Sequence, residues 1–277
     1  MVSGARLPQP RLTCGHYKEV YAKNHNDYSM HAIILAAGVG QRLFGDSRSQ
    51  PPKCLIEFDG KTLLKRHFEV LQELGIEKLT LIVGYRKNLI VEEATACAPD
   101  GFLEVIENLM YRGGSLISMW YARETYRRGE DVLFMDADTL YDPEVLKRLV
   151  NSKSGTALVY DKDLDEGDDP VRICLRDGEV VDFGKRIVGQ FDAIGEWPGF
   201  MKVSAETGPL IAAALENYIE GGQLMATYEE AIRDVIVGER TSVFEIVDIS
   251  DLNWIEIDFP EDLERAREVI LPKLSNS

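Results

Sequence analysis

The sequence predicts an α/β protein built on a doubly wound, mostly parallel sheet. Short apolar runs, such as those at 32–35 and 132–135, alternate with stretches of helical period, which is typical of strands covered on both faces. The chain of 277 residues is long enough for one substantial core and contains no internal repeat or low-complexity linker. We expect one domain over residues 30–277, preceded by an N-terminal extension, residues 1–29, that lacks hydrophobic periodicity.

The first half of the predicted domain alternates strand and helix. Leu74 closes an apolar helical stripe, Gly75 is expected to end that helix, and Ser115 is expected to cap the next one. Strands are predicted at 32–35, 55–58, 79–83, 103–106 and 132–135, and helices at 62–74, 115–126 and 143–150.

The second half begins with strands joined by tight polar turns. Asp177-Gly178 is a hairpin signal between two of them. Strands are predicted at 156–160, 171–175, 180–183, 197–203, 243–248 and 254–257, and helices at 208–218, 228–237 and 260–271. A ligand is expected at the carboxyl ends of the parallel strands, because that edge is where open α/β sheets bind their substrates.

Composition excludes several classes of function. The 31 basic and 47 acidic side chains give a net charge of −16, which argues against a nucleic-acid surface or an anionic membrane. No apolar run approaches the roughly 20 residues that span a bilayer. Four cysteines without a close pair, and no apolar signal segment, predict a cytoplasmic protein with reduced thiols. So acidic a chain is expected to place its few cations where an anionic substrate binds.

A run of small residues follows the first predicted strand. The sequence AAGVG at 36–40 leaves the backbone open, and its glycines allow amide groups to turn toward phosphate oxygens. Arg42 adds a planar cation and Lys53, after two prolines, a movable one. An ordinary tight turn is the alternative interpretation, and these two cations disfavour it. Leu43 stands where a dinucleotide loop needs its third glycine, and 41–43 is not the end of a Walker loop.

Two acidic segments lie at predicted strand ends. Asp136 and Asp138 follow the strand at 132–135 and are two residues apart, so extended backbone points them to the same side. Glu256 and Asp258 share a face of the last strand. Magnesium prefers such oxygen ligands. From the residues alone, helix capping or solvent exposure remains open for each segment.

The motif LAAGVGQRL followed by PPK resembles the signature of nucleotidylyltransferases that make sugar nucleotides and related activated head groups. The resemblance extends from Met30 to about Leu271. It implies a Rossmann-like fold with a β-hairpin subregion that binds the acceptor. Arg42 and Lys53 would hold the triphosphate, and Lys185, after the hairpin, the phosphate of the acceptor. Implied nucleotide contacts are Leu35, Ala36, Ala37, Gly38 and Gly40. Implied Mg²⁺ ligands are Asp138 and Asp258, with Asp136 either a third ligand or a partner of the ligands.

The segment ENLMYRGGSLISMW resembles the part of phosphocholine and inositol-phosphate cytidylyltransferases that meets the nucleotide, which adds Gly113, Gly114 and Ser115 to the expected nucleotide site. The IEIDFPED ending favours the same branch. The implied function is Mg²⁺-dependent transfer of CMP from CTP to a small phosphate or phosphonate monoester. The alternatives are a sugar-1-phosphate uridylyl-, thymidylyl- or guanylyltransferase, a metal-dependent glycosyltransferase, and a regulatory subunit that only binds nucleotide. Of the aromatic residues Tyr111, Trp120, Trp197, Tyr228 and Trp254, one or two are expected in an acceptor pocket and the rest in the core.

Overall fold

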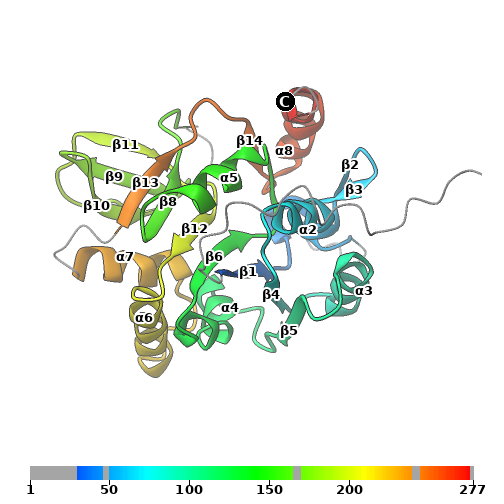
Figure 1. Cartoon of the computed structure of the whole chain (residues 1–277), viewed down its shortest axis with the longest axis horizontal. Helices are drawn as coiled ribbons and strands as arrows, with labels where there is room; N and C mark the ends of the chain where they lie inside the picture. The colour runs from blue at the N-terminus through cyan, green and yellow to red at the C-terminus, as the bar shows by residue number, and fades with distance from the viewer. Residues whose placement is uncertain (1–29, 46–49, 165–169, 239–243, 275–277) are drawn as a thin grey trace, which may run out of the picture.

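A computed structural model describes residues 30–45, 50–164, 170–238 and 244–274; the predicted extension, residues 1–29, lies outside them. Its centre is a seven-stranded sheet in the order β13-β8-β12-β6-β1-β4-β5 (Figure 1). Only β12 runs antiparallel to its neighbours, which confirms the predicted mostly parallel sheet. The strands are β1 (Met30–Ala36), β4 (Lys78–Val83), β5 (Leu103–Glu107), β6 (Asp131–Asp136), β8 (Thr156–Tyr160), β12 (Phe200–Val203) and β13 (Phe244–Asp248).

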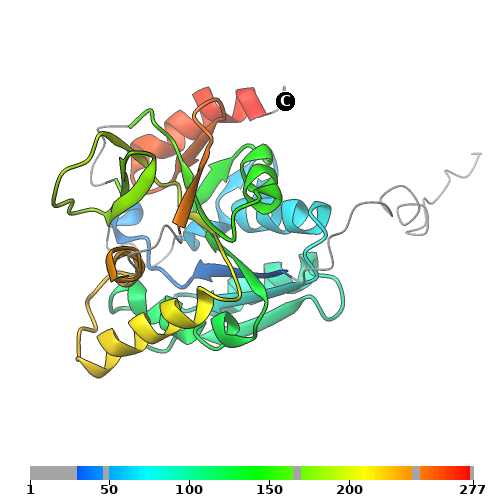
Figure 2. The ribbon, with the colours of Figure 1, turned by 60° about the vertical axis from the view of Figure 1, so that its left-hand side comes forward.

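Helices cover both faces of this sheet, as a doubly wound fold requires. Figure 2 shows α2 (Leu63–Glu73) and α5 (Glu144–Asn151) on one face, and α4 (Ser115–Tyr121) and α6 (Gly208–Glu220) on the other. The central strands are apolar and fully buried between the two helical layers, which is why their sequences do not alternate. No helix within the described ranges combines the length and the apolar character needed to cross a membrane.

The expected local signals for α2 are present at both ends. The Thr62 hydroxyl accepts a hydrogen bond from the Lys65 amide at 3.0 Å. Beyond the last turn, Gly75 has φ +74°, and the Ile76 amide donates to the Leu71 carbonyl at 3.0 Å. This is the bonding pattern of a glycine-terminated helix.

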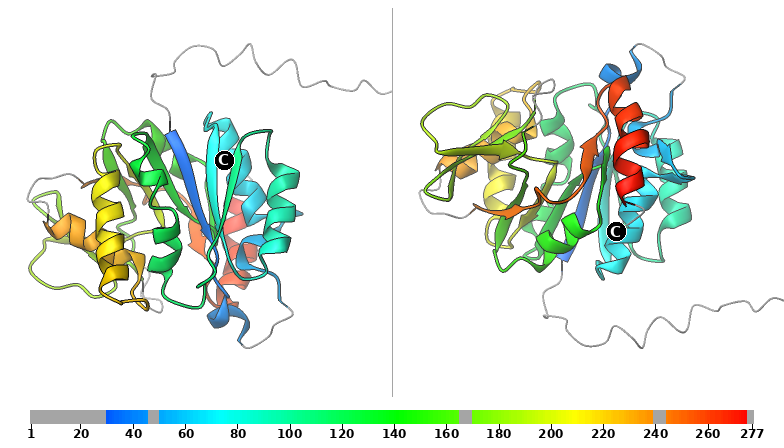
Figure 3. Two further views of the ribbon diagram at one scale, coloured as in Figure 1. Left: turned by 90° about the horizontal axis from the view of Figure 1, so that it is seen from below. Right: turned by 90° about the horizontal axis from the view of Figure 1, so that it is seen from above.

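A second, three-stranded sheet in the order β10-β9-β11 stands at one end of the molecule, and β5 with α3 (Lys87–Cys97) stands at the other (Figure 3). Asp177 and Gly178 both have positive φ and form the predicted hairpin turn. This small sheet packs on α7 (Tyr228–Gly238) and consists of β9 (Arg172–Arg176), β10 (Glu179–Gly184) and β11 (Ala193–Glu196).

The small sheet lies in an excursion of the chain between β8 and β12, and the excursion leaves and rejoins the main sheet at one point. There the Asp161 amide donates to the Glu196 carbonyl at 3.0 Å, and the Glu196 amide donates to the Asp161 carbonyl at 2.7 Å. We call this reciprocal pair the neck of the excursion.

The remaining elements form the side of the molecule near the C-terminus. Leu43, Phe58, Leu63 and Ile257 pack with the last helix in a second apolar cluster. These elements are α1 (Gln41–Phe44), η1 (Lys53–Leu55), β2 (Glu57–Phe58), β3 (Lys61–Thr62), β7 (Thr139–Tyr141), β14 (Trp254–Glu256), α8 (Pro260–Arg265), η3 (Ala266–Ile270) and α9 (Leu271–Leu274). The short helix η2 (Thr125–Arg127) lies elsewhere, against α6 and β6.

Several predicted elements differ from the structure. The predicted strand at 55–58 is a short turn of helix followed by one arm of the β2-β3 hairpin. The strand at 197–203 starts only at Phe200, because Gly199, at φ +87°, turns the chain between β11 and β12. Gly114 rather than Ser115 occupies the cap position of α4, which ends at Tyr121 instead of 126. The first residue of the strand predicted at 243–248 lies outside the described residues.

Candidate active site

A cavity of about 510 Å³ opens where β1 and β6 end. Its lining contains all fourteen residues that the sequence predicts to bind the nucleotide, the triphosphate, the acceptor's phosphate or the metal. These are Leu35, Ala36, Ala37, Gly38, Gly40, Arg42, Lys53, Gly113, Gly114, Ser115, Asp136, Asp138, Lys185 and Asp258. The structure therefore brings residues that are more than 200 positions apart, such as Lys53 and Asp258, into direct contact.

The loop after β1 presents bare backbone to the cavity. A side chain at Gly38 would meet nothing within 4 Å, so the loop surface is open at that position. Gly40, which directly precedes α1, has φ +69°, a backbone conformation that residues with a side chain rarely adopt. Ala37 is anchored from below, because its carbonyl accepts a hydrogen bond from the Tyr85 amide at 3.1 Å.

The facing wall is the segment 113–115, which is clamped to residues 224–226. The Gly114 amide donates to the Leu224 carbonyl at 2.8 Å, and a Cβ on Gly114 would lie 2.0 Å from the Ala226 carbonyl oxygen. The Ser115 hydroxyl accepts a hydrogen bond from the Tyr228 amide at 3.2 Å instead of capping its own helix. Only glycine allows this close backbone approach, so the wall is backbone rather than side chain.

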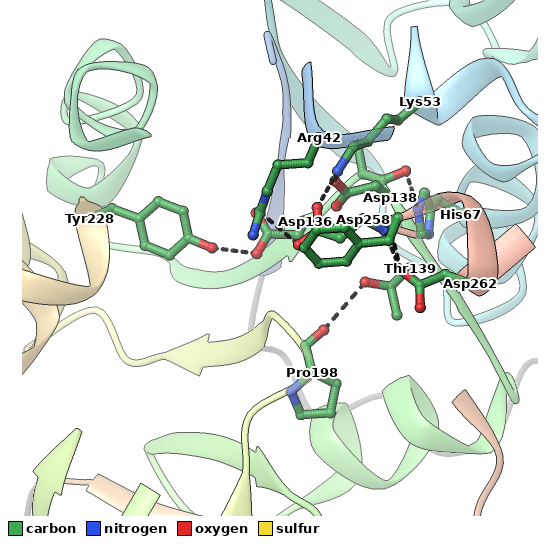
Figure 4. A network of polar contacts seen from close by, with 12 residues as sticks. Arg42, Lys53, His67, Asp136, Asp138, Thr139, Pro198, Tyr228, Asp258 and Asp262 are labelled. Atoms are coloured by element: carbon green, nitrogen blue, oxygen red, sulfur yellow. Dashed lines mark hydrogen bonds and ion pairs between the residues drawn. The ribbon is translucent and has the colours of Figure 1, made fainter. Parts of the chain in front are cut away.

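Two cations meet two carboxylates in the lining of the cavity (Figure 4). The Lys53 Nζ lies 3.0 Å from Asp138 Oδ2 and also contacts Asp258 Oδ1. The Arg42 Nη2 lies 2.6 Å from Asp258 Oδ2, and its guanidinium covers the Phe259 ring at 5.4 Å. Burial alone would lower the pKa of Lys53, but the charges of Asp138 and Asp258 more than offset it and raise that pKa. Lys53 is therefore fully cationic at neutral pH.

Glu256 joins the two aspartates in a group of carboxylates that could hold a metal ion. Oxygens of Asp138, Glu256 and Asp258 lie within 4.8 Å of one another. The Glu256 side chain is exposed overall. Its pKa is nevertheless raised to about 8, mainly because the surrounding protein removes water from its carboxylate and, to a smaller extent, because Asp138 and Asp258 are negatively charged. The sequence placed Glu256 on the face of Asp258 but did not identify it as a site residue.

The two acidic segments are fixed to each other by their backbones. The Ile257 amide donates to the Asp138 carbonyl at 3.0 Å. Asp262 accepts hydrogen bonds from the amides of Asp258 and Phe259 at 2.8 and 2.7 Å, so Asp262 bonds the backbone at the start of the last helix. The Asp258 carboxylate is thereby left to face Arg42 and Lys53, and helix capping, which the residues alone left open, is not its role.

His67 supports the same region from α2. Its Nε2 lies 3.2 Å from the Ala137 carbonyl oxygen, and its Nδ1 lies 3.1 Å from the Tyr141 hydroxyl. The imidazole is fully buried, and burial lowers its pKa to about 4. A neutral His67 therefore donates a hydrogen bond from its Nε2–H group to the carbonyl of Ala137, between Asp136 and Asp138. Sequence reasoning missed this contact, because a histidine in an amphipathic helix carries no local sign of its partner.

Asp136 points away from the cluster formed by Asp138, Glu256 and Asp258. Its Oδ2 accepts a hydrogen bond from the Tyr228 hydroxyl, and its amide donates to the Gly199 carbonyl at 3.0 Å. Burial, together with the nearby charge of Asp138, raises the pKa of Asp136 well above its usual range. Among the described residues, Asp136 is not part of the group formed by Asp138, Glu256 and Asp258.

The other end of the lining comes from the second half of the chain. Lys185 follows β10 directly and lies in the cavity wall together with Trp197, Tyr228 and Glu229. Of the aromatic candidates, Tyr111, Trp197 and Tyr228 line this cavity, whereas Trp120 and Trp254 do not. Glu229 was missed, because the start of α7 resembles the polar first turn of any amphipathic helix.

Comparison with known proteins agrees with this architecture. The chain is 24% identical to the CTP:phosphoglutamine cytidylyltransferase of Campylobacter jejuni, over 85% of this chain and 98% of that protein. It is 27% identical to the CMP-5'-(3-aminopropyl)phosphonate synthase of Streptomyces rubellomurinus, over 86% of this chain but only 38% of that longer protein. Its fold matches the inositol-1-phosphate CTP transferase of T. maritima with a TM-score of 0.70 at 23% identity, over 91% of this chain and 98% of that one.

One family model extends over more than half of the sequence. The model of the MobA-like NTP transferase domain matches residues 32–193, which contain the glycine loop, Lys53, Asp136 and Asp138. The expected resemblance to nucleotidylyltransferases is thus confirmed, and the chain belongs to the MobA-like NTP transferase domain family as a nucleotidyltransferase.

Proposed function

We propose that the protein transfers CMP from CTP to a small phosphate or phosphonate monoester, with Mg²⁺ as cofactor and pyrophosphate as the second product. The observation that carries the proposal is the meeting of a bare backbone loop, two cations and three carboxylates in one cavity. The relatives support CTP as the donor, since CTP or CMP appears in the names of all three proteins described above.

On the donor side, the two walls at 35–40 and 113–115 supply the nucleotide contacts. Both are largely backbone, so amide and carbonyl groups would meet the donor and acceptor groups of the cytosine ring. A wrong base leaves buried polar groups mismatched, at about 1–3 kcal/mol for each lost hydrogen bond. CTP should therefore be strongly preferred over ATP and GTP. The preference over UTP should be smaller, because fewer hydrogen bonds distinguish the two pyrimidines.

Arg42 and Lys53 would bind the triphosphate. Both cations contact carboxylates across the cavity, so each is held where the phosphates of a bound nucleotide would pass. Charge builds up on the pyrophosphate as it leaves, and fixed cations stabilise that charge without reorganisation of solvent. The flexible Lys53 stem and the planar Arg42 head suit a moving and a stationary phosphate respectively.

The carboxylate group fits Mg²⁺. Its donors are all carboxylate oxygens, and a cation, the Lys53 ammonium, already lies against two of them. Asp138 and Asp258 would hold the metal with Glu256 beside them, while Asp136 orients Tyr228 instead. Bound there, Mg²⁺ would supply neutralisation of the negative charge shared by the two reacting phosphates.

Lys185 would bind the acceptor's phosphate at the other end of the cavity. One oxygen of that phosphate then attacks the α-phosphorus of CTP, the bond to the bridging oxygen breaks, and pyrophosphate leaves. No general base is required, because a phosphate monoester is already ionised near neutral pH, with a second pKa of about 6. What the protein contributes is alignment of two anions that repel each other.

Pyrophosphate release tests the proposal. The purified chain is incubated with CTP, UTP, ATP or GTP, each with choline phosphate, inositol phosphate, 2-aminoethylphosphonate or glucose-1-phosphate, with MgCl₂ or with EDTA. We expect release with CTP and one of the first three acceptors, in MgCl₂ only. Asp138→Asn should abolish it, whereas Asp100→Asn, on an exposed turn, should not. Preference for UTP or a purine would refute the donor assignment, and no release with any pair would refute the transfer reaction.

A further inference from the structure

Glu229 is a buried acid in the cavity wall that the reaction described above does not use. Its side chain is 7% exposed, and its residue lines the cavity at the start of α7. Within the described part of the chain, its Oε2 is enclosed and has no hydrogen-bond partner. An enclosed carboxylate oxygen without a partner is costly, typically about 1–3 kcal/mol or more for a charged group, so a ligand that satisfies it would be bound selectively.

The neighbours of Glu229 place it at the acceptor end of the cavity. Lys185, Trp197 and Tyr228 line the same region, and Figure 4 shows Tyr228 on the far side of Asp136 from Lys53. Burial raises the pKa of Glu229, while hydrogen bonds to its carboxylate from its own backbone and from Thr227, and then the charge of Lys185, act in the opposite direction. The unsatisfied atom is Oε2 alone. Lys185, the cation that the proposed function assigns to the acceptor's phosphate, therefore lies close to Glu229, a buried acid with no assigned ligand.

The missing partner of the Glu229 Oε2 is a group that donates a hydrogen bond. A carboxylate oxygen accepts hydrogen bonds only, and bonds from a cationic donor are about twice as strong as neutral ones. A fully methylated ammonium has no proton to donate and would need an open aromatic face instead. Trp197 does not offer one freely, because it is 3% exposed and its ring contacts those of Phe134, Phe183 and Tyr228.

From these contacts we infer that the acceptor carries a primary ammonium group as well as its phosphate or phosphonate, and that Glu229 is the residue that selects it. The inference rests on the proposed transfer reaction and narrows its acceptor to a zwitterion. Lys185 and Glu229 then form a pair of opposite charges that matches the two ends of such a molecule. A neutral alcohol phosphate would engage Lys185 but would leave the Glu229 Oε2 without a hydrogen-bond donor.

A set of acceptors that differ only at one end tests the inference. The rate constant kcat/KM is measured by pyrophosphate release from CTP with 2-aminoethylphosphonate, 2-hydroxyethylphosphonate, propylphosphonate and 2-(trimethylammonio)ethylphosphonate. For the unmodified protein, we expect the ammonium compound to exceed the propyl isostere by ten- to a hundredfold, as a charge-assisted hydrogen bond predicts. In Glu229→Gln this ratio should fall to within about fivefold. The Kd for CTP with Mg²⁺ should not change.

The matched control is Glu230→Gln, the next residue of α7, whose exposed side chain is not part of the lining. It should keep the full acceptor ratio. The inference is overturned if the unmodified protein uses propylphosphonate or the trimethylammonio compound as well as the primary amine, or if Glu229→Gln keeps the ratio. Absence of pyrophosphate release with every acceptor and every triphosphate, despite CTP binding, would instead overturn the proposed function.

Discussion

Replacing Lys53 by methionine should damage both stability and turnover, and the structure gives the size of each effect. The Lys53 side chain is 13% exposed and its ammonium bonds both Asp138 and Asp258. Methionine keeps the buried stem and removes only the charge. The three carboxylates of Asp138, Glu256 and Asp258 then remain together. Among the described ion pairs, Arg42 is the one cation that still contacts them, through Asp258.

Breaking a fully buried pair costs about 3–5 kcal/mol, and the open side of this cavity reduces that to about 1–3 kcal/mol. For a domain of this size, 1 kcal/mol corresponds to about 2 °C, so the Tm in EDTA should fall by about 2–6 °C. Excess MgCl₂ should raise the Tm more in the variant than in the unmodified protein, because the freed carboxylates bind the metal ion without competition from the ammonium. Pyrophosphate release should fall by roughly 10²- to 10⁴-fold.

Thermal unfolding followed by circular dichroism, with and without MgCl₂, measures the first effect and the pyrophosphate assay the second. Lys61→Met is the control, since Lys61 makes an exposed ion pair with Glu69 at 2.7 Å that should contribute less than about 1 kcal/mol. If Lys53→Met keeps both its Tm and its turnover, the placement of Lys53 on the reacting phosphates is wrong. A variant that MgCl₂ no longer stabilises would show that the carboxylates are not the metal site.

Three further predictions concern other parts of the site. Asp138→Asn and Asp258→Asn should each reduce Mg²⁺-dependent turnover, and the double variant should be little worse than either, because ligands of one ion act as a unit; multiplicative losses would contradict a shared ion. Gly114→Ala should lower stability by about 1–3 kcal/mol and weaken CTP binding, as seen by calorimetry, because its Cβ would lie 2.0 Å from the Ala226 carbonyl oxygen. Burial lowers the pKa of His67 from 6.5 to about 4, so the unfolded chain binds a proton first as the pH falls. Stability should therefore be complete above pH 6.5 and decline toward pH 4 by up to about 3 kcal/mol, and urea titrations of His67→Gln should show a flatter decline over that range.

Local sequence signals were sufficient for the elements that carry a strong pattern. The buried strands, the capped α2 and the Asp177-Gly178 hairpin follow from apolar runs and turn residues. In contrast, α3 was missed because only Ile90 and Ala94 of its eleven residues are buried, so it has almost no apolar stripe. The antiparallel insertion of β12 was also missed, since strand order depends on partners far away in the sequence.

The candidate site likewise contains residues that local sequence signals predict and residues that only the fold reveals. The loop after β1 and the two cations could be predicted, because small residues and isolated basic residues are visible in a sequence. Glu229 and His67 could not, since both depend on burial that other segments impose. The contribution of Glu256 depends on the backbone bond from Ile257 to Asp138, which joins two segments more than a hundred residues apart.

The neck between Asp161 and Glu196 has a consequence for how such enzymes diversify. Both ends of the excursion enter the main sheet at a single pair of reciprocal hydrogen bonds, so its interior can change in length or sequence without shifting the register of β8 or β12. Lys185 lies inside the excursion, whereas the glycine loop and Lys53 lie outside it. Recombination at these two positions would therefore exchange the small sheet and Lys185 between relatives, while the glycine loop, Lys53 and Glu229 stay with the main sheet and its helices. The same two positions are the natural junctions for a designed chimera.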